Sequence, residues 1–303
     1  MSKITRLIAI DWGSTNFRAY RLENGSETQI ITHPIGVTQV EQPANFDHLL
    51  VNVLAPWRNW IAAHHVPVIM AGMIGSDRGW VDSGYQMLPQ APTAIKLGCI
   101  RVDSTLPTEV YLRPGLAVNH DDCVNVMRGE EVQLLGAMAQ LSADCYVFPG
   151  THAKWVTPQG GIIPRFNTVM TGELYHLLMQ NSLLGQGVAK EIVPEAFAQG
   201  LQAGINAGSN IIAQLFFARS ARILHRMPAE HVAGWLSGLL IGHEVATQSA
   251  NLKPSSTVAI IAAPSLAALY RQAFRLLSIN ATILDPEEAI IHGFRSIYHE
   301  LYS

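Results

Sequence analysis

Cysteine is scarce in this sequence, and the few cysteines are widely spaced. Cys99, Cys123 and Cys145 are 3 in number and form no C-x-x-C pair, which argues against both a zinc site and a disulfide framework. The 12 histidines show neither His-x-His nor His-Glu-x-x-His spacing. We therefore expect buried apolar thiols and no protein-bound transition metal.

Charged residues are also sparse, at 14% of the sequence, and the net charge is -3. A strong nucleic-acid footprint needs a basic surplus, so nucleic acid is excluded as a general partner. Small anionic ligands are compatible with this composition, because a few local cations and backbone amides suffice for them. With 49% hydrophobic residues over 303 positions, the chain can fill two packed lobes.

Long hydrophobic runs are missing as well. Residues 1–6 lack the apolar core of a signal peptide. The longest apolar stretch, Val232 to Gly242, is interrupted by Gly, Ser and Trp and is too short to span a membrane. We expect a cytoplasmic protein without a membrane segment. The sequence is compatible with a homo-oligomer but does not specify one.

Two common nucleotide-binding motifs are absent, since neither G-x-x-x-x-G-K-[ST] nor a strand-linked G-x-G-x-x-G occurs. The sequence instead contains two strand–turn–strand patterns, one with a Gly-Ser turn and one with a Gly-Thr turn. The repetition of this pattern predicts one strand–turn–strand unit in each of two lobes, residues 1–143 and 144–303. The flanking strands are expected at Leu7–Ile10, Phe17–Leu22, Tyr146–Phe148 and Trp155–Thr157.

Hydrophobic periodicity predicts mainly helices outside these units. Pro56 should kink or end the first helix, and Pro286 with the acids that follow it opens the last one. The last helix is expected to be able to return to the first lobe. The predicted elements are helices at 46–57, 129–141 and 286–301, strands at 66–71, 258–262 and 281–284, and a mainly helical remainder beyond Glu173.

The first turn has the chemistry of a phosphate loop. Gly13 lets the backbone approach a phosphate, and the amides and hydroxyls of Ser14 and Thr15 can then bind its oxygens. Asp11, at the strand end, is placed to hold Mg²⁺ through a water, since Mg²⁺ keeps much of its hydration shell. A plain Asp-Gly turn between two strands explains the same residues without a ligand.

The second turn complements the first. Gly150 and Thr151 suit a phosphate, His152 follows directly, and Lys154 can neutralise a phosphate charge. A hydrogen-bonded loop histidine and a solvated lysine explain His152 and Lys154 equally well.

Together with several longer strings, these loops resemble the 2-dehydro-3-deoxygalactonokinase family of the sugar kinase/heat-shock protein/actin superfamily. The order and spacing of the strings agree over nearly the whole chain. The strings are Ala9–Asn16, Ala71–Ser76 with Gly79, Trp80 and Tyr85, Val126–Glu131, Pro149–Trp155, and Met170–Leu174.

The resemblance implies an α/β, two-lobed sugar kinase/actin-like fold of duplicated ribonuclease H-like domains with an interlobe cleft. It also implies transfer of the ATP γ-phosphate to the C6 hydroxyl of 2-dehydro-3-deoxy-D-galactonate. The products would be ADP and the 6-phosphate, which an aldolase splits in galactonate breakdown. The N-terminal lobe would hold the first phosphate loop and the sugar-acid pocket, and the C-terminal lobe the second loop and the adenosine site.

The adenosine-binding turn departs from the pattern of the superfamily, which usually has glycine there. In this sequence the turn reads Ala262, Ala263, Pro264, Ser265. The phosphate loops are unaffected by this change. It leaves open how closely the backbone approaches adenine, and therefore which nucleotide is preferred.

Phosphoryl transfer needs a carboxylate that takes the proton of the acceptor hydroxyl. Glu130 and Glu131 open a predicted helix, whose N-terminus stabilises a carboxylate. By analogy with the catalytic Asp in a Gly-Asp-Gln segment of glycerol kinase-type enzymes, Glu130 aligns with the base, and Glu131 is the alternative. Ordinary first-turn acids on a solvated helix explain both residues without catalysis.

The sugar acid needs an apolar wall and donors for its carboxylate. The carboxylate donors are expected among Ser76, Arg78 and Arg165, although an unplaced arginine is usually a surface residue. Thr171, Gly172 and Glu173 begin a helix whose amides can hold substrate or phosphate, and plain helix capping explains Thr171 almost as well. The expected wall consists of Gly72, Met73, Ile74, Gly75, Ser76, Trp80 and Tyr85.

Other function classes share these phosphate loops. A nucleotide-switched module of the actin or chaperone type would carry a partner-binding domain or a long tail, whereas this sequence ends at Ser303 after its last predicted helix. Through the resemblance, the Gly-Met-Ile-Gly-Ser and Met-Thr-Gly-Glu strings argue against a kinase for an amino sugar or a pantothenate-like alcohol. If the protein bound a sugar acid without ATP, the two phosphate loops would have no function. The preference between C4 epimers is left open.

Overall fold

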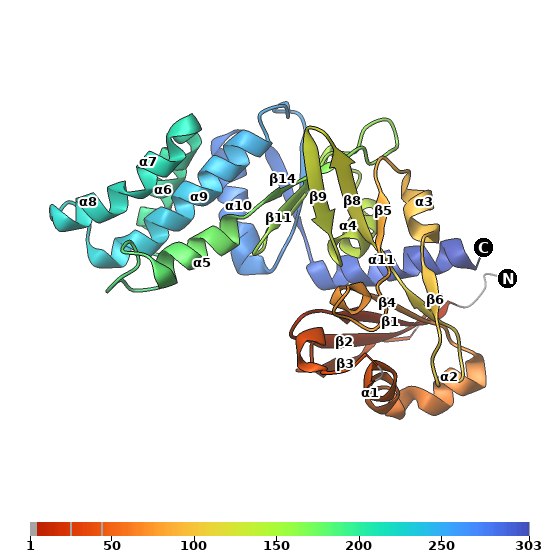
Figure 1. Cartoon of the computed structure of the whole chain (residues 1–303). Coiled ribbons are helices and arrows are strands. Elements are labelled where there is room, and N and C mark those ends of the chain that lie inside the picture. Colours follow the sequence, from red (N-terminus) through yellow and green to blue (C-terminus); the bar gives the residue numbers. More distant parts are fainter. Residues whose placement is uncertain (1–4, 25, 44, 303) are drawn as a thin grey trace. The chain divides into compact units, whose positions relative to one another are not determined.

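The computed structural model describes residues 5–24, 26–43 and 45–302 (Figure 1). The chain divides into two compact units. Unit 1 comprises the chain up to residue 142, residues 157–166 and the chain from residue 286 onward, and unit 2 comprises residues 143–156 and 167–285. Residues 1–4, on which part of the signal-peptide argument rests, and Ser303 lie outside the described residues. The functional division into lobes at residue 143 stays a prediction.

Unit 1 is built on a mixed sheet in the order β3-β2-β1-β4-β7-β6. β1 and β2 form the predicted hairpin, with Trp12 opposite Phe17, so that residues 13–16 are its turn. β4 runs parallel to β1, with Ala71 opposite Asp11, so both strands end at the same edge. The strands are β1 Arg6–Trp12, β2 Phe17–Glu23, β3 Gln29–His33, β4 Val68–Ala71, β6 Ile100–Val102 and β7 Val110–Leu112.

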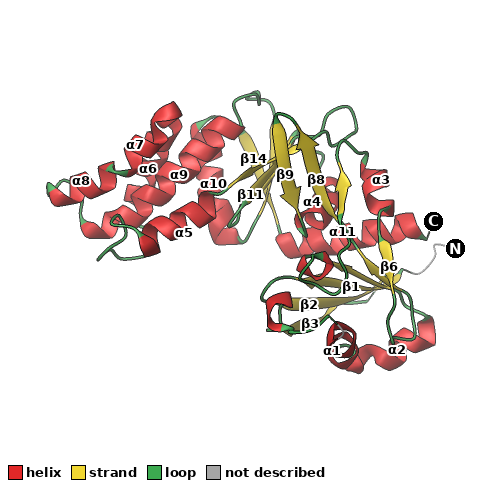
Figure 2. Cartoon of the chain, in the orientation of Figure 1, coloured by secondary structure: helices red, strands yellow, loops and turns green. Residues whose placement is uncertain are grey.

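Two short helices cover one face of this sheet (Figure 2). α1 ends at Val53, before Pro56, as the sequence predicts. The buried rings of Trp12 and Phe46 meet edge to face at 5.4 Å, which places the helix against the end of β1. The elements are α1 Asn45–Val53, η2 Ala55–Trp57, α2 Arg58–His64 and the 3-10 turn η1 Val37–Gln39.

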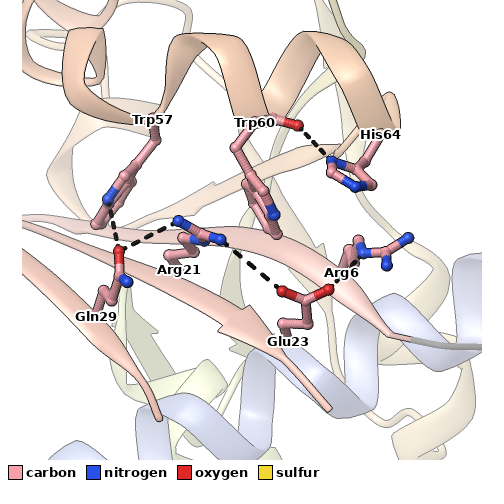
Figure 3. A network of polar contacts seen from close by, with 7 residues as sticks. All are labelled: Arg6, Arg21, Glu23, Gln29, Trp57, Trp60 and His64. Carbon is pink, nitrogen blue, oxygen red and sulfur yellow. Dashed lines mark hydrogen bonds and ion pairs between the residues drawn. The ribbon is translucent and has the colours of Figure 1, made fainter. Parts of the chain in front are cut away.

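A polar network joins α2 and its preceding turn to β1, β2 and β3 (Figure 3). The guanidinium of Arg21 lies 4.1 Å from the centroid of the Trp60 ring, and Trp57 Nε1 donates to Gln29 Oε1 at 3.1 Å. Glu23 accepts from Arg6 Nε at 2.6 Å. These contacts hold the helix on the sheet far along the strands from the turn at 13–16.

A second helix pair belongs to unit 1. α4 packs closely along α11, because Gly136 lets the two backbones touch: a Cβ at this position would overlap the carbonyl oxygen of Ala289. The predicted start of the last helix at residue 286 is confirmed. The helices are α3 Pro92–Leu97, α4 Glu130–Gln140 and α11 Pro286–Leu301, with the 3-10 turn η3 Met73–Gly75.

Unit 1 also contains a small sheet in the order β5-β8-β9, which the sequence analysis did not predict. Its outer face is open, with Val124 and Val126 exposed on β9. Exposed apolar side chains on short strands give no clear alternation between core and solvent, so the pattern is hard to detect. The strands are β5 Tyr85–Met87, β8 Gly115–His120 and β9 Cys123–Met127.

Unit 2 is built on a mixed sheet in the order β12-β11-β10-β13-β14. β10 and β11 form the second predicted hairpin, with Phe148 opposite Lys154. β13 and β14 confirm the two late strand predictions and run parallel to each other. The strands are β10 Cys145–Phe148, β11 Ala153–Val156, β12 Phe166–Val169, β13 Thr257–Ile261 and β14 Asn280–Leu284.

The rest of unit 2 is helical, as predicted. α9, which contains the longest apolar stretch, is buried along most of its length and packs against α6. Over the described residues, no helix combines the length and hydropathy that crossing a membrane requires. The helices are α5 Thr171–Asn181, α6 Pro194–Ala207, α7 Ile211–Leu215, α8 Phe217–Ile223, α9 Val232–Gln248 and α10 Pro264–Leu276, with the 3-10 turns η4 Gly208–Asn210 and η5 Ala229–His231.

Candidate active site

The first predicted phosphate loop is the turn between β1 and β2. The N–H of Gly13 donates to the carbonyl of Asn16 at 2.9 Å. The carbonyl of Ser14 accepts from the N–H and the hydroxyl of Thr38, at 3.2 and 2.7 Å. These bonds fix the backbone of the turn and leave the side chains of Ser14 and Thr15 exposed, where an anion can reach them.

Asp11 lies where the ends of two strands and the start of a helix converge. Gly72, directly after β4, has a φ of +94°, and a Cβ there would lie 3.2 Å from Oδ1 of Asp11. Gly129, directly before α4, has a φ of +104°, and its Cβ would lie 3.7 Å from Cα of Gly72. Glycine adopts such a backbone at low cost, so these two positions allow the approach.

The charge of Asp11 is disfavoured by its surroundings. Burial raises its pKa from 3.8 to about 6; Arg18, its cross-strand partner, lowers the pKa, and Glu130 raises it. Glu130 therefore lies close enough for its charge to repel that of Asp11. A divalent cation relieves such repulsion, and Mg²⁺ is commonly held by one or two carboxylates with waters and phosphates. The acidic pair fits that ion.

Glu130 and Glu131 occupy different surroundings at the start of α4. Glu130 is half-buried, and its Oε2 accepts from the N–H of Arg128 at 3.1 Å. Glu131 is fully buried, its Oε2 accepts from the N–H of Gly129 at 2.6 Å, and burial raises its pKa to about 7 although Arg113 lowers it. The geometry supports Glu130 as the group that meets a ligand and gives Glu131 a part in holding the turn at Gly129.

The segment after β4, expected to form the sugar-acid wall, is largely packed inside unit 1. Ile74 is fully buried in the hydrophobic core, so its side chain is not part of a pocket wall, contrary to expectation. The hydroxyl of Ser76 donates to the carbonyl of Met73 at 2.7 Å and so closes the 3-10 turn. Trp80 packs against the same core, whereas Tyr85 on β5 is exposed.

The two arginines predicted as carboxylate donors lie at the surface of unit 1. Arg165 forms an exposed ion pair with Asp122, at 2.9 Å between Nη1 and Oδ2. Arg78 is exposed in the turn that follows Ser76. Both side chains are exposed, so their roles as carboxylate donors stay predictions.

The second predicted phosphate loop is clamped to the start of α5 in unit 2. The N–H of Glu173 donates to the carbonyl of Thr151 at 3.0 Å, and Nε2 of His152 lies 2.5 Å from Oε2 of Glu173. Gly172 permits this contact, because a Cβ there would overlap the carbonyl oxygen of Gly150. The structure therefore joins residues that were predicted separately, one set for nucleotide and one for substrate.

Lys154 was expected in the loop, and that position is wrong. It lies within β11, opposite Phe148, and is 5% exposed. The strand begins at Ala153, because cross-strand pairing with β10 extends to the last residues before the turn. A contact between Lys154 and phosphate stays a prediction.

A cavity of about 630 Å³ opens beside this loop. Its polar end is formed by the loop and the start of α5, and its apolar walls come mainly from α9 and α10. A volume in this range suits a drug-sized ligand, and the combination suits one with an apolar body and an anionic end. The lining residues are Gly150, Thr151, Thr171, Gly172, Glu173, Tyr175, His176, Ile192, Ser237, Leu240, Ile241, Leu266, Leu269 and Tyr270.

The predicted adenosine turn leads from β13 into α10. Ala263 is the N-cap of α10, and Leu266 and Leu269 of that helix line the cavity. Ser265 lines an adjoining hollow of about 380 Å³ that shares Ile192, Leu266 and Leu269 with it. The glycine-free turn thus lies beside a space large enough for the predicted adenosine.

A buried carboxylate ties the cavity walls together. Oε1 of Glu244, on α9, accepts from Nε1 of Trp155 on β11 at 2.7 Å, and Oε2 accepts from the hydroxyl of Tyr270 on α10 at 2.7 Å. Burial raises the pKa of Glu244, while hydrogen bonds from Thr171, Tyr270 and Trp155 lower it. Three elements, α5, β11 and α10, are therefore fixed to one side chain of α9.

Sequence reasoning missed three residues near these sites, Arg18, Arg128 and Glu244. Arg18 could have been found, since the hairpin pairing that was predicted places it opposite Asp11. Arg128 adjoins Glu130 in a string that was noted, but its contacts with residues 83–85 are distant in sequence. Glu244 carries no local signal, because its partners lie on other elements.

Comparison with known proteins identifies the family. Residues 11–297 match the family model described as 2-keto-3-deoxy-galactonokinase. A 2-dehydro-3-deoxygalactonokinase of Escherichia coli K12 is 40% identical over 97% of this chain and 98% of its own length. A crystal structure from Sinorhizobium meliloti, provisionally described as a 2-dehydro-3-deoxygalactonokinase, superposes with a TM-score of 0.88 at 28% identity, covering 98% of this chain and 99% of that one.

A more distant likeness concerns the fold alone. Component A of (R)-2-hydroxyglutaryl-CoA dehydratase from Acidaminococcus fermentans has a TM-score of 0.50 at 13% identity, covering 99% of this chain and 97% of that one. The α/β fold of the sugar kinase/actin type that the sequence predicts is confirmed. On the family match and the 40% identity to the Escherichia coli protein, the chain belongs to the 2-keto-3-deoxy-galactonokinase family.

Proposed function

We propose that this chain is a kinase that transfers the γ-phosphoryl group of ATP to the C6 hydroxyl of 2-dehydro-3-deoxy-D-galactonate. The products are 2-dehydro-3-deoxy-6-phosphogalactonate and ADP. The observation that carries the proposal is 40% identity over 97% of the chain to an enzyme named for this reaction. Both ligands are small molecules. The cytoplasmic location and a homo-oligomeric state stay predictions.

The acidic pair of unit 1 is assigned to the chemical step. Glu130 takes the proton of the C6 hydroxyl as the oxygen attacks the γ-phosphorus, and the bond from that phosphorus to the β,γ-bridging oxygen breaks as ADP leaves. Asp11, whose pKa is raised by burial and further by Glu130, is assigned to hold Mg²⁺. The ion supplies neutralisation of phosphate charge when bound. The loop at 13–16 contributes backbone and hydroxyl groups to phosphate.

The cavity of unit 2 is assigned to the nucleoside. Leu240, Ile241, Leu266 and Leu269 offer apolar surface to a purine ring, and the loop at 150–152 with the start of α5 meets the phosphates. His152 and Glu173 are then a phosphate-side pair, with Glu173 orienting the imidazole. The cavity supports ATP as the nucleotide and leaves the preference among triphosphates to experiment.

The reaction is tested with a panel of 3-deoxy-2-oxo sugar acids and Mg-ATP, read by ADP release. The expected result is turnover of 2-dehydro-3-deoxy-D-galactonate with formation of a phosphate ester at C6. Absence of turnover with every acid of the panel would contradict the proposal.

Two matched variants separate catalysis from structure in the same assay. Glu130→Gln should lower kcat by about 10²–10⁴-fold at unchanged melting temperature, because it removes the proton acceptor. Glu131→Gln should leave kcat within a few-fold of the parent value, because Glu131 is fully buried and the glutamine amide oxygen can still accept from Gly129. If Glu131→Gln alone is inactive at unchanged stability, the assignment of the base is wrong.

A further inference from the structure

The guanidinium of Arg128 is held in a fixed position beside the start of α4. Its Nη1 donates to Oγ of Ser83 at 2.9 Å, and its Nη2 donates to the carbonyl of Gly84 at 3.1 Å. The guanidinium carbon lies 4.4 Å from the centroid of the Tyr85 ring. An arginine held by two hydrogen bonds and a ring has lost most of its rotational freedom before any ligand arrives.

The segment expected to bind the sugar acid wraps around this guanidinium. The hydroxyl of Ser83 donates to the carbonyl of Gly75 at 2.9 Å, and a Cβ on Gly75 would lie 3.1 Å from Nη1 of Arg128. Gly75 and Tyr85 are both residues that the sequence analysis assigned to the substrate. Arg128 therefore connects the two ends of that segment to the helix that carries Glu130.

The charge balance of Arg128 differs from that of several other arginines. Among the described residues, Arg6, Arg18, Arg21, Arg101 and Arg165 form ion pairs with acidic side chains, and the guanidinium of Arg128 does not. Its Nε is buried and, within the described part of the chain, has no hydrogen-bond partner. Arg128 is therefore a half-buried cation with neutral partners, a setting in which the charge of an anionic ligand would be compensated.

We propose that Arg128 binds the carboxylate of the sugar acid, an inference that rests on the proposed function. The rival donors are less suited: the hydroxyl of Ser76 is committed to Met73, and Arg165 is paired with Asp122 at the surface. The carboxylate and the C6 hydroxyl lie at opposite ends of the substrate. The N–H of Arg128 contacts Glu130, and its guanidinium contacts Ser83 and Gly84. Arg128 therefore links the assigned base to the segment expected to bind the sugar acid.

Arg128→Lys tests the assignment, because lysine keeps the charge and loses the fork that meets a carboxylate. KM for the sugar acid should rise about 10–100-fold with a much smaller change in kcat, since lysine offers the carboxylate a point charge in place of two parallel donors. KM for ATP should be unchanged.

Arg21→Lys is the matched control. Arg21 also lies in unit 1 and stacks on an aromatic ring, Trp60, at 4.1 Å, but its other partners are Gln29 and Glu23 (Figure 3). It should leave KM for the sugar acid unchanged while lowering the melting temperature. Equal rises of KM in both variants would mean that Arg128 acts only through the fold.

The C1 amide of the substrate lacks the carboxylate charge. A purely structural role of Arg128 would not change the preference of the protein for the acid over this amide. The parent protein should bind the acid much more tightly than the amide, and Arg128→Lys should remove most of that difference. The inference is overturned if the preference for the acid persists, if kcat alone falls, or if the preference is lost in Arg78→Gln or Arg165→Gln instead. Calorimetric binding of the acid to the parent and to Arg128→Lys decides the point even if no turnover is found, so its failure is distinct from failure of the proposed function.

Discussion

Asp11 is a residue whose charge the folded chain disfavours until a ligand compensates it. Burial raises its pKa to about 6 from 3.8, so the folded state binds the proton more tightly than the unfolded state. The stability contributed by the protonated form is fully present below pH 3.8 and is lost as the pH rises through about 6. The ionised form of Asp11, which is the form that can hold Mg²⁺, therefore lowers the stability of the ligand-free protein near neutral pH.

Asp11→Asn should accordingly stabilise the ligand-free protein and inactivate it. The pKa difference sets an upper limit of about 3 kcal/mol on the gain at pH 7.5, and the gain should shrink as the pH falls toward 4.5. Removing the Mg²⁺ ligand should lower kcat by several orders of magnitude. Urea unfolding at the two pH values and ADP release measure the two effects. A variant that is active, or no more stable at pH 7.5 than the parent, contradicts the assignment.

The residues that sequence reasoning placed best are those whose role depends on the local backbone. Asp11 and Gly13 follow a predicted strand in a short motif, and the structure has them at the end of β1 and in its turn. Ile74 was misplaced because the wall and the core draw on the same apolar residues. Arg128 and Glu244 were missed because their contacts join segments that only the folded chain brings together.

At the scale of elements, α4 depends on a backbone contact that one methyl group would disrupt. Gly136 touches α11 so closely that a Cβ would overlap the carbonyl of Ala289. Gly136→Ala should therefore cost about 1–3 kcal/mol or more, although alanine is the better helix former. Because α4 carries Glu130 at its start, kcat should fall as well.

Ala139→Ser on the same helix is the control, since residue 139 is exposed and should tolerate the change. Thermal unfolding and kcat are compared for both variants. An unchanged melting temperature for Gly136→Ala would mean that α11 can move away from α4 at little cost. The expectation that packing of α4 against α11 positions Glu130 would then be wrong.

The elements that sequence patterns predicted are those with strong local signals. Both hairpins, the stop of α1 before Pro56 and the start of α11 at Pro286 follow from strand runs, turn residues and proline. The small sheet of β5, β8 and β9 was missed, since its open face carries apolar side chains such as Val124 and Val126. The start of β11 was placed too late because pairing with β10 decides it.

At the scale of the whole molecule, the residues assigned to the sugar acid and the cavity assigned to the nucleoside belong to different compact units. Asp11, Glu130 and Arg128 lie in unit 1, and the cavity beside Thr151 lies in unit 2. Each unit has its own sheet and its own hydrophobic core. Binding of one ligand should therefore stabilise mainly the unit that holds it, because local opening is suppressed where contacts form.

Hydrogen exchange with one ligand at a time tests this division. The sugar acid alone should slow exchange in unit 1, at residues 72–85 and at the start of α4. A non-hydrolysable ATP analogue alone should slow exchange in unit 2, at the loop 149–152 and in α5, α9 and α10, and to a smaller extent at the turn 13–16. The helix α2, held on its sheet by the network of Figure 3, should respond to neither ligand. If the analogue slows exchange only in unit 1, or the sugar acid only in unit 2, the assignment of the ligands to the units is wrong, because protection must appear where the contacts are made.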